Sequence, residues 1–186
     1  MKSRKYIVLV LLFFLKSIII NAQHKLNDNN YSRGLKFNLV SPFVGSFAVQ
    51  YESSINKDAS LVLSGYYFTG QITNITEPFR GFGIAGEYRY YTSYKEMEGF
   101  YLQPFIRYQY LKEVQKNLMA YSTIGPGILF GYQSILIKNF VLDMYIGSAY
   151  NFGRIDYNTV NQSSYDPSIF LDNYSIRGGV SFGFLF

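Results

Sequence analysis

The last thirteen residues of the chain alternate between apolar side chains and small or polar ones, and no other feature of the sequence limits the fold as strongly. Residues 174–186 read YSIRGGVSFGFLF: the even positions are mainly aromatic or aliphatic, and the odd positions carry Ser, Arg and Gly until Leu185. A period of two is the period of a β-strand. A strand of this length with one apolar face suits a tilted bilayer crossing, which takes about 9 to 11 residues. The chain end therefore predicts a membrane-crossing β-strand.

Residues 1–22 have the features of a cleaved secretory signal peptide. They combine a basic start, an apolar run at residues 7–15 and Ala22 before the expected cleavage site. The alternative is a membrane-anchoring helix, but Lys16 ends the apolar run well short of the roughly 20 residues that a spanning helix needs. The expected organisation is a signal peptide at 1–22, a short periplasmic tail at 23–34 and a β-barrel at 35–186.

The composition excludes several classes of function. The formal net charge of +5 includes four basic residues of the expected signal peptide, and without them 13 basic residues stand against 12 acidic ones, a net of +1. A net charge this small does not indicate the basic surface that nucleic-acid binding needs. The chain has no cysteine, which excludes disulfides, a thiolate nucleophile and a cysteine zinc site.

The alternation recurs along the chain, with turn-forming residues between the alternating segments. We predict strands at residues 35–41, 46–54, 59–68, 81–92, 99–110, 121–133, 138–152 and 174–186. These segments predict an all-β fold, an eight-stranded antiparallel transmembrane β-barrel.

A soluble barrel or sandwich, with its apolar face inward, would show the same period. The polar faces favour the membrane, because a soluble exterior is about 25 to 35% charged and these faces are mainly Gly, Ser, Ala, Asn, Gln and Tyr. Tyrosines near the strand ends resemble the aromatic girdles of outer-membrane barrels. Our interpretation is a monomeric barrel surrounded by outer-membrane lipid, and the soluble barrel is the alternative.

The connections between the predicted strands alternate in length. Those after the second, fourth and sixth strands are short, and those after the third, fifth and seventh cover residues 69–80, 111–120 and 153–173. Outer-membrane barrels have short periplasmic turns and longer external loops. We therefore expect both termini on the periplasmic side, and only the first external connection, around residues 42–44, breaks the trend.

Several segments together resemble an uncharacterised family of small outer-membrane β-barrels common in Bacteroidota. They are EYRYY (87–91), GFYLQPFIRY (99–108), GILFGYQ (127–133), LDMYIGSAYNFG (142–153) and RGGVSFGFLF (177–186). The resemblance implies the barrel fold and an outer-membrane location, and no catalytic residues. In such barrels the terminal aromatic strand is similar to the signal read by the barrel-insertion machinery, a role that would fall on Phe182, Phe184 and Phe186.

Residues 81–86, GFGIAG, match the dinucleotide-binding pattern GxGxxG. That site needs the motif to end a strand and open a helix. Here an aromatic strand follows it, so we expect glycines within a strand and no bound cofactor.

The side chains that support catalysis or metal binding are scarce. Barrel enzymes that act on lipid or protein use a catalytic histidine, and the only histidine here is His24 in the expected tail. Metal ligation is equally poor, because Cys is absent and the carboxylates are scattered. We expect no catalytic residues and no metal, and a lipid-modifying envelope enzyme is the least favoured alternative.

Seven charged residues fall on the predicted inner faces, where they would be costly unless paired. They are Lys36, Glu52, Glu87, Arg89, Arg107, Asp143 and Arg177. We predict a structural hydrogen-bonded network, with Lys36 opposite Glu52 across the first hairpin. An eight-stranded barrel is just wide enough for side chains to fill it, so an open solute pore is not expected.

The loops at 69–80 and 153–173 are the predicted place for contact with an extracellular ligand, if the barrel is an adhesion or binding module. Tyr157, Tyr165 and Phe170 are the candidate contacts in the longer loop, among Asn, Ser and Asp residues. The alternative is a variable solvated loop without a binding role. We favour a non-enzymatic barrel with a structural or surface-interaction role.

Overall fold

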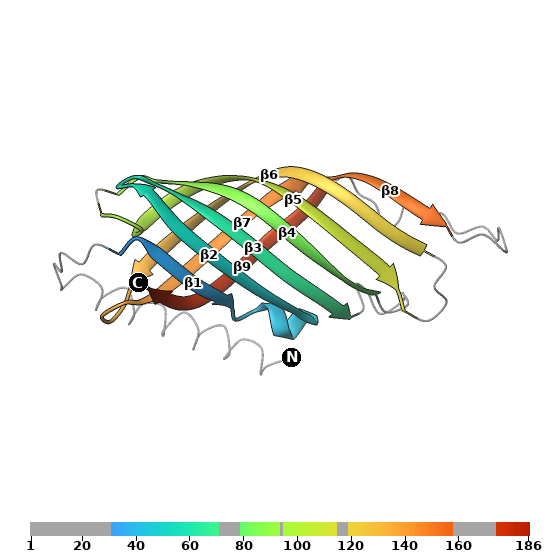
Figure 1. Ribbon diagram of the computed structural model, residues 1–186, viewed down its shortest axis with the longest axis horizontal. Helices are drawn as coiled ribbons and strands as arrows, with labels where there is room; N and C mark the ends of the chain where they lie inside the picture. Colours follow the sequence, from blue (N-terminus) through green and yellow to red (C-terminus); the bar gives the residue numbers. More distant parts are fainter. Residues whose placement is uncertain (1–30, 71–78, 94, 115–118, 158–173) are drawn as a thin grey trace, which may run out of the picture.

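The computed structural model describes residues 31–70, 79–93, 95–114, 119–157 and 174–186, which form a closed β-barrel (Figure 1). The strands are β1 (Arg33–Asn38), β2 (Ser46–Asn56), β3 (Ala59–Gly70), β4 (Phe79–Tyr91), β5 (Gly99–Glu113), β6 (Met119–Ile135), β7 (Phe140–Tyr150), β8 (Phe152–Tyr157) and β9 (Tyr174–Leu185). A short 3-10 helix, η1 (Ser41–Val44), joins β1 to β2. Within the described ranges there is no helix long and apolar enough to cross a membrane.

The barrel closes because both ends of the sheet find a partner. The strand order is β5-β4-β3-β2-β1-β9-β7-β6-β8, all neighbours are antiparallel, and β5 also pairs with β6. β7 and β8 occupy one position in the wall, because both pair with β6 in the same register. Ala149 faces Gly127 and Phe152 faces Ile124, and only Asn151 between them is outside the strands. The prediction of an all-β, eight-stranded antiparallel barrel is therefore confirmed.

Several predicted boundaries were wrong by a few residues. The first strand spans Arg33–Asn38 instead of 35–41, because Pro42 lies in the first turn of η1 and Gly45, at φ 68°, ends it in a left-handed conformation. The predicted tail 23–34 thus loses its last two residues to β1. The predicted long loops are shorter than expected, since β3 runs to Gly70, β4 begins at Phe79, β5 ends at Glu113 and β8 covers 152–157.

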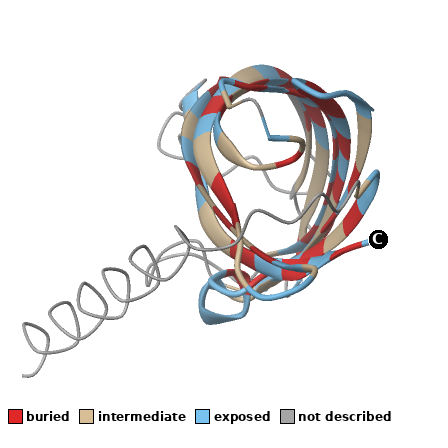
Figure 2. Ribbon diagram, turned by 90° about the vertical axis from the view of Figure 1, so that its left-hand side faces the viewer, coloured by how far each residue is buried: buried red, intermediate tan, exposed pale blue. Residues whose placement is uncertain are grey.

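The short connections lie together at one end of the barrel, which we call the turn end. It carries the turns at 57–58, 92–98 and 136–139, and Arg33 pairs there with the chain end, with Phe186 N donating to Arg33 O over 2.8 Å. We call the opposite end, where β1, β3 and β5 finish, the loop end. Figure 2 views the barrel from the turn end, with strands surrounding the interior.

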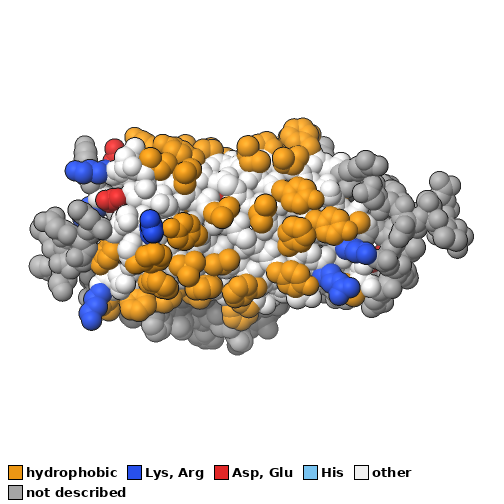
Figure 3. Space-filling view, in the orientation of Figure 1, with side chains coloured by type: hydrophobic (Ala, Val, Ile, Leu, Met, Phe, Trp, Pro, Cys, Tyr) orange, Lys and Arg blue, Asp and Glu red, His pale blue; other side chains and the backbone are white. Residues whose placement is uncertain are grey.

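Alternate residues of each strand point into the barrel or away from it. Along β4 the burial pattern alternates strictly from Arg80 to Tyr91, with odd positions inside. The outer face exposes large apolar side chains that include Phe47, Leu63, Phe82, Ile84, Ile106, Phe130, Ile146 and Ile176. In Figure 3 the apolar side chains form a broad band, and Lys and Arg lie towards its two ends.

Glycines on the inner face make room for aromatic rings on the neighbouring strand. Tyr101 lies opposite Gly131, and a Cβ placed on Gly131 would stand 2.3 Å from the Tyr101 ring. Phe105 and Gly127 make the same pair at 2.4 Å. The lack of a side chain at these glycines therefore lets the rings of Tyr101 and Phe105 pack against the neighbouring strand.

The turn end is packed with buried apolar side chains. Met97, at φ 53°, is 1% exposed and belongs to the same buried cluster as Val141 and Leu185. Its carbonyl accepts a hydrogen bond from Gln133 Nε2 at 2.8 Å. The turn between β4 and β5 is thus tied to the interior of the barrel.

We predict that Gly131→Ala destabilises the barrel by about 1 to 3 kcal/mol, because the added methyl displaces the Tyr101 ring. Gly86→Ala is the matched control, since a Cβ there meets nothing within 4 Å, and should change the free energy of unfolding by less than about 0.5 kcal/mol. Urea unfolding in detergent measures both. Equal effects would show that the inner glycines are not space-limited.

Candidate functional site

The structure places all seven predicted charged residues inside the barrel. Lys36, Glu52, Arg89 and Asp143 are completely buried, and Glu87 and Arg107 are nearly so. The side chain of Arg177 is 16% exposed. They divide into a central group of four, a separate ion pair and Arg107.

The central group, which we call the ionic tetrad, consists of Lys36, Glu52, Arg89 and Asp143. Lys36 Nζ lies 2.6 Å from Glu52 Oε2 and 2.9 Å from Asp143 Oδ2. Arg89 contacts the same two carboxylate oxygens, at 3.3 Å from Glu52 and 3.0 Å from Asp143. Two cations thus share two anions, and the tetrad is neutral overall.

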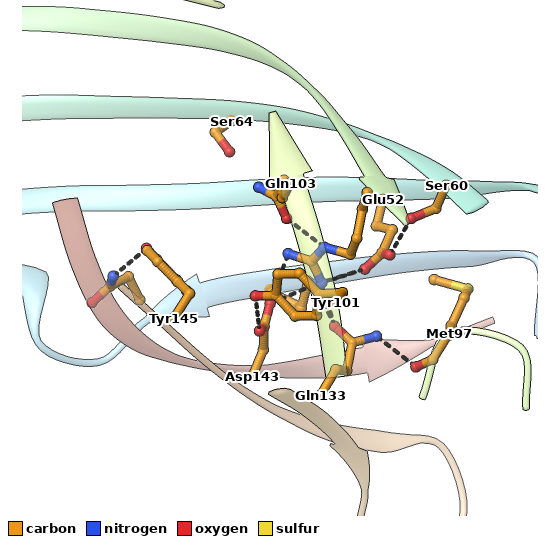
Figure 4. Close-up of polar contacts among 12 residues, drawn as sticks. Glu52, Ser60, Ser64, Met97, Tyr101, Gln103, Gln133, Asp143 and Tyr145 are labelled. Atoms are coloured by element: carbon orange, nitrogen blue, oxygen red, sulfur yellow. Dashed lines mark hydrogen bonds and ion pairs between the residues drawn. The ribbon is translucent and has the colours of Figure 1, made fainter. Parts of the chain in front are cut away.

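Uncharged side chains complete the hydrogen bonding of the tetrad (Figure 4). Gln133 Oε1 accepts from both Lys36 Nζ and Arg89 Nη1, each at 2.7 Å. Tyr91 donates to Glu52 Oε1 and Tyr101 to Asp143 Oδ1, both at 2.6 Å. Ser60 also donates to Glu52. The Arg89 guanidinium lies 3.8 Å from the centre of the Tyr101 ring, a cation–π contact.

The tetrad and its partners come from every strand between β1 and β7. Lys36 is on β1, Glu52 on β2, Arg89 on β4 and Asp143 on β7, while Ser60, Tyr101 and Gln133 belong to β3, β5 and β6. A buried charge is tolerated only when it is paired and hydrogen-bonded. Satisfying these charges therefore requires the sheet to close.

The predicted register of the first hairpin was wrong by two residues. Lys36 was expected opposite Glu52, but Lys36 faces Gln50 and Glu52 faces Gly34. The ion pair forms diagonally, since a shift of two residues keeps both side chains on the inner face. The connection bends earlier than expected because η1 begins at Ser41.

A second ion pair lies beyond the tetrad, towards the loop end. Arg177 Nη2 is 2.8 Å from Glu87 Oε1 and donates to Ser64 Oγ at 3.2 Å. Gln103 donates to the other Glu87 oxygen and accepts from Arg89 Nε. Gln103 therefore connects this ion pair to the tetrad.

Arg107 differs from the other predicted charges because it has no carboxylate partner within the described residues. Its Nη2 donates to Asn151 Oδ1 at 3.0 Å and to Ser175 Oγ at 2.7 Å. Asn151 sits at the break between β7 and β8. Arg107 thus reaches across the interior to β9 through neutral groups only.

The sequence interpretation missed the neutral members of the network. Tyr91, Tyr101, Gln103 and Gln133 are completely or almost completely buried. Each occupies an inner-face position of its strand, so alternation could have placed them inside. Their partners were not predictable, because Gln133 and Lys36 are 97 residues apart.

The chemistry open to this interior is limited. Ser60 donates its hydroxyl hydrogen to the ion-paired Glu52, so this carboxylate is not a free general base. Among the described residues, no three His, Asp or Glu side chains gather in a way that could hold a metal ion. The GFGIAG segment lies within β4 and continues as strand to Tyr91, without the helix that a dinucleotide site needs.

The predicted insertion signal lies on the outer face of the barrel. Phe182, Phe184 and Phe186 are all exposed, and Phe182 stacks on Phe140 of β7 with ring centres 5.5 Å apart. Of the predicted loop contacts, Tyr165 and Phe170 lie outside the described residues. Tyr157 ends β8, in the backbone pairing with Met119.

The fold and its interior define a class: a small closed β-barrel with a neutral ionic network inside and a broad apolar outer face. The chain belongs to the family described as "Protein of unknown function (DUF3575)", whose profile matches residues 7–170. Comparison with curated proteins gave no match, and comparison with solved structures gave none either.

We predict that Lys36→Met destabilises the barrel by about 3 to 5 kcal/mol, because it leaves two buried carboxylates facing one cation. Lys95→Met is the control: Lys95 is 53% exposed and 3.6 Å from Glu98, and an exposed pair contributes about 0 to 1 kcal/mol. The free energy of unfolding in detergent measures both. The double variant Lys36→Met/Asp143→Asn should lose less than Lys36→Met alone, and an equal or larger loss would contradict the charge-balance explanation.

Proposed function

We propose that the protein is a non-enzymatic outer-membrane β-barrel whose role is structural or surface-interacting. One observation carries the proposal: the polarity of the barrel is the reverse of that of a soluble protein. Charged groups such as Lys36 and Arg89 are fully buried, while Ile84 is 53% and Ile146 is 65% exposed. Lipid would cover such an outer face, and a monomer in water would leave it exposed at high cost.

The closed sheet supports the same proposal. A membrane has no water to satisfy free backbone groups, so only helices and closed barrels cross it. The strands are long enough for a tilted crossing, with 13 residues in β4 and 12 in β9. Export by a cleaved signal peptide, recognition of the terminal aromatics by the barrel-insertion machinery and a Bacteroidota-type source belong to the proposal as well.

The filled interior supports an anchoring role over solute conduction. Lys36, Arg89, Gln103 and Gln133 are each 0% exposed, which favours a bore that is filled at the level of the tetrad over a continuous water-filled channel. A barrel whose bore is filled does not conduct solute, and its proposed role is to anchor the loop end at the membrane surface. The adhesion alternative rests on loops at 69–80 and 153–173, of which residues 71–78 and 158–173 lie outside the described residues.

Two measurements on the purified chain and on whole cells test the proposal. A membrane barrel should migrate faster on a gel when unheated than when boiled, and protease added to intact cells should cleave only in the loop-end connections. It should give no steady conductance in planar bilayers. A water-soluble monomer without detergent, or cleavage in the 92–98 turn of intact cells, would contradict the proposal.

We predict that Ile84→Arg costs about 2 to 4 kcal/mol in lipid bilayers, because Ile84 lies halfway along β4 on the outer face. Ile55→Arg is the control at the edge of the apolar band. Ile55 is 55% exposed and lies one residue from the end of β2, so its cost should be about 0 to 1 kcal/mol. Unfolding in phosphatidylcholine bilayers measures both, and equal small costs would favour the soluble alternative.

A further inference from the structure

Two arginines lie in the loop-end half of the interior, and they differ in their partners. Arg107 and Arg177 lie in this half, and Glu87 forms its ion pair with Arg177 alone. The described residues place no carboxylate within ion-pair distance of Arg107. The two arginines are linked through β9, because Ser175, which accepts from Arg107, is two residues before Arg177 on the same face.

Both guanidinium groups retain unused donors. Arg107 is 8% exposed, and its buried Nε has no hydrogen-bond partner. Nη1 of Arg177 is likewise buried without a partner. Leaving a buried charged donor unsatisfied is costly. In the tetrad, by contrast, Arg89 uses all three of its nitrogens.

Strand pairing in the barrel wall is interrupted beside these arginines, and we call this interruption the notch. β1 pairs with β9 only from Ser181 to Leu185 and with β2 only from Val49 to Ser53. The last backbone contact on this side is Leu39 N donating to Val180 O at 2.7 Å. Among the described residues, β9 therefore has no strand partner on its β1 side from Tyr174 to Gly179, the segment that carries Ser175 and Arg177.

The rim of the notch is apolar and strongly exposed. Phe43 is 90% and Val44 is 59% exposed on the β1–β2 connection, and Ile176 is 85% and Tyr174 is 71% exposed on β9. These side chains suit contact with acyl chains. The notch thus places an apolar rim on the outside next to arginine groups on the inside.

We propose that Arg107, together with Arg177, forms a binding site for an oxyanion group such as a phosphate. Arg107 supplies the unused Nε donor, Arg177 supplies Nη1, and the anion gives both donors the hydrogen-bond partner that they lack. Guanidinium groups are suited to oxyanions because their planar donors bind two oxygens at once. The source of the oxyanion is either a free anion or the headgroup of an anionic lipid that reaches the site through the notch.

The site goes beyond the proposed function, because its charges and contacts do not depend on membrane insertion. Only entry of a lipid through the notch rests on the membrane location. The test therefore uses the folded full chain in a sugar-headed detergent, which contains no phosphate. Failure of this test leaves the gel-migration and cell-proteolysis results unaffected.

The experiment measures the unfolding temperature by circular dichroism against increasing sodium phosphate, with sodium chloride at matched ionic strength. A second arm adds dioleoylphosphatidylglycerol to the micelles, with dioleoylglycerol as the uncharged control. Arg107→Gln is the test variant. Arg80→Gln is the control, since it removes one positive charge at an exposed position on the outer face of β4.

We expect a ligand that binds the folded state to raise the unfolding temperature. Arg107→Gln should weaken the response at least about tenfold in concentration, because it removes charge-assisted hydrogen bonds, and Arg80→Gln should respond like the wild type. A response to phosphate assigns a free anion, and a response to the anionic lipid alone assigns a headgroup. No response in either arm, or equal responses of Arg107→Gln and wild type, would overturn the site. If Arg107→Gln does not fold, Arg107→Lys replaces it, since it keeps the charge and loses the Nε donor.

Discussion

The shared ion pairing of Lys36 and Arg89 with Glu52 and Asp143 is the constraint on which the rest of the barrel depends. All four side chains are fully buried, so each loses its hydration and must regain it from the others. Their partners extend through Ser60, Tyr101 and Gln133 to every strand from β1 to β7. An open sheet would leave several of these groups without partners. The network therefore favours a closed barrel with a single alignment of its strands, as well as filling the bore.

The packing around the tetrad follows from the narrowness of an eight-stranded barrel. The interior admits rings such as Tyr101 and Phe105 only because Gly131 and Gly127 face them. Met97 and Leu185 fill the turn end. The remaining large apolar side chains lie on the outer face, because the interior has no further room for them. There they form the band in Figure 3. The reversed polarity and the filled interior are thus two results of one arrangement, and the filled interior supports the proposed anchoring role over conduction.

The two ends of the barrel differ in how completely their charged side chains are satisfied. At the tetrad every charge has a partner, which is typical of a structural network. Towards the loop end, Arg107 has neutral partners and an Nε without a partner, and β9 loses its strand partner where β1 ends at Asn38. Natural proteins tend to leave local rules unmet at functional positions. This contrast is the reason to look for a ligand near Arg107 and not at the tetrad, although the tetrad holds more charge.

The sequence by itself determined the strands, their number and which side chains face inward, because the alternation of residues 174–186 and of the other strands has the period of a β-strand. It placed all seven charged residues inside the barrel for the same reason. It did not determine the hairpin register, since a two-residue shift keeps Lys36 and Glu52 on the same face. Only the tertiary structure decided three features: the partners of each charge, the break at Asn151 and the notch beside β9. Each of them depends on strands from distant parts of the chain that meet around the closed barrel.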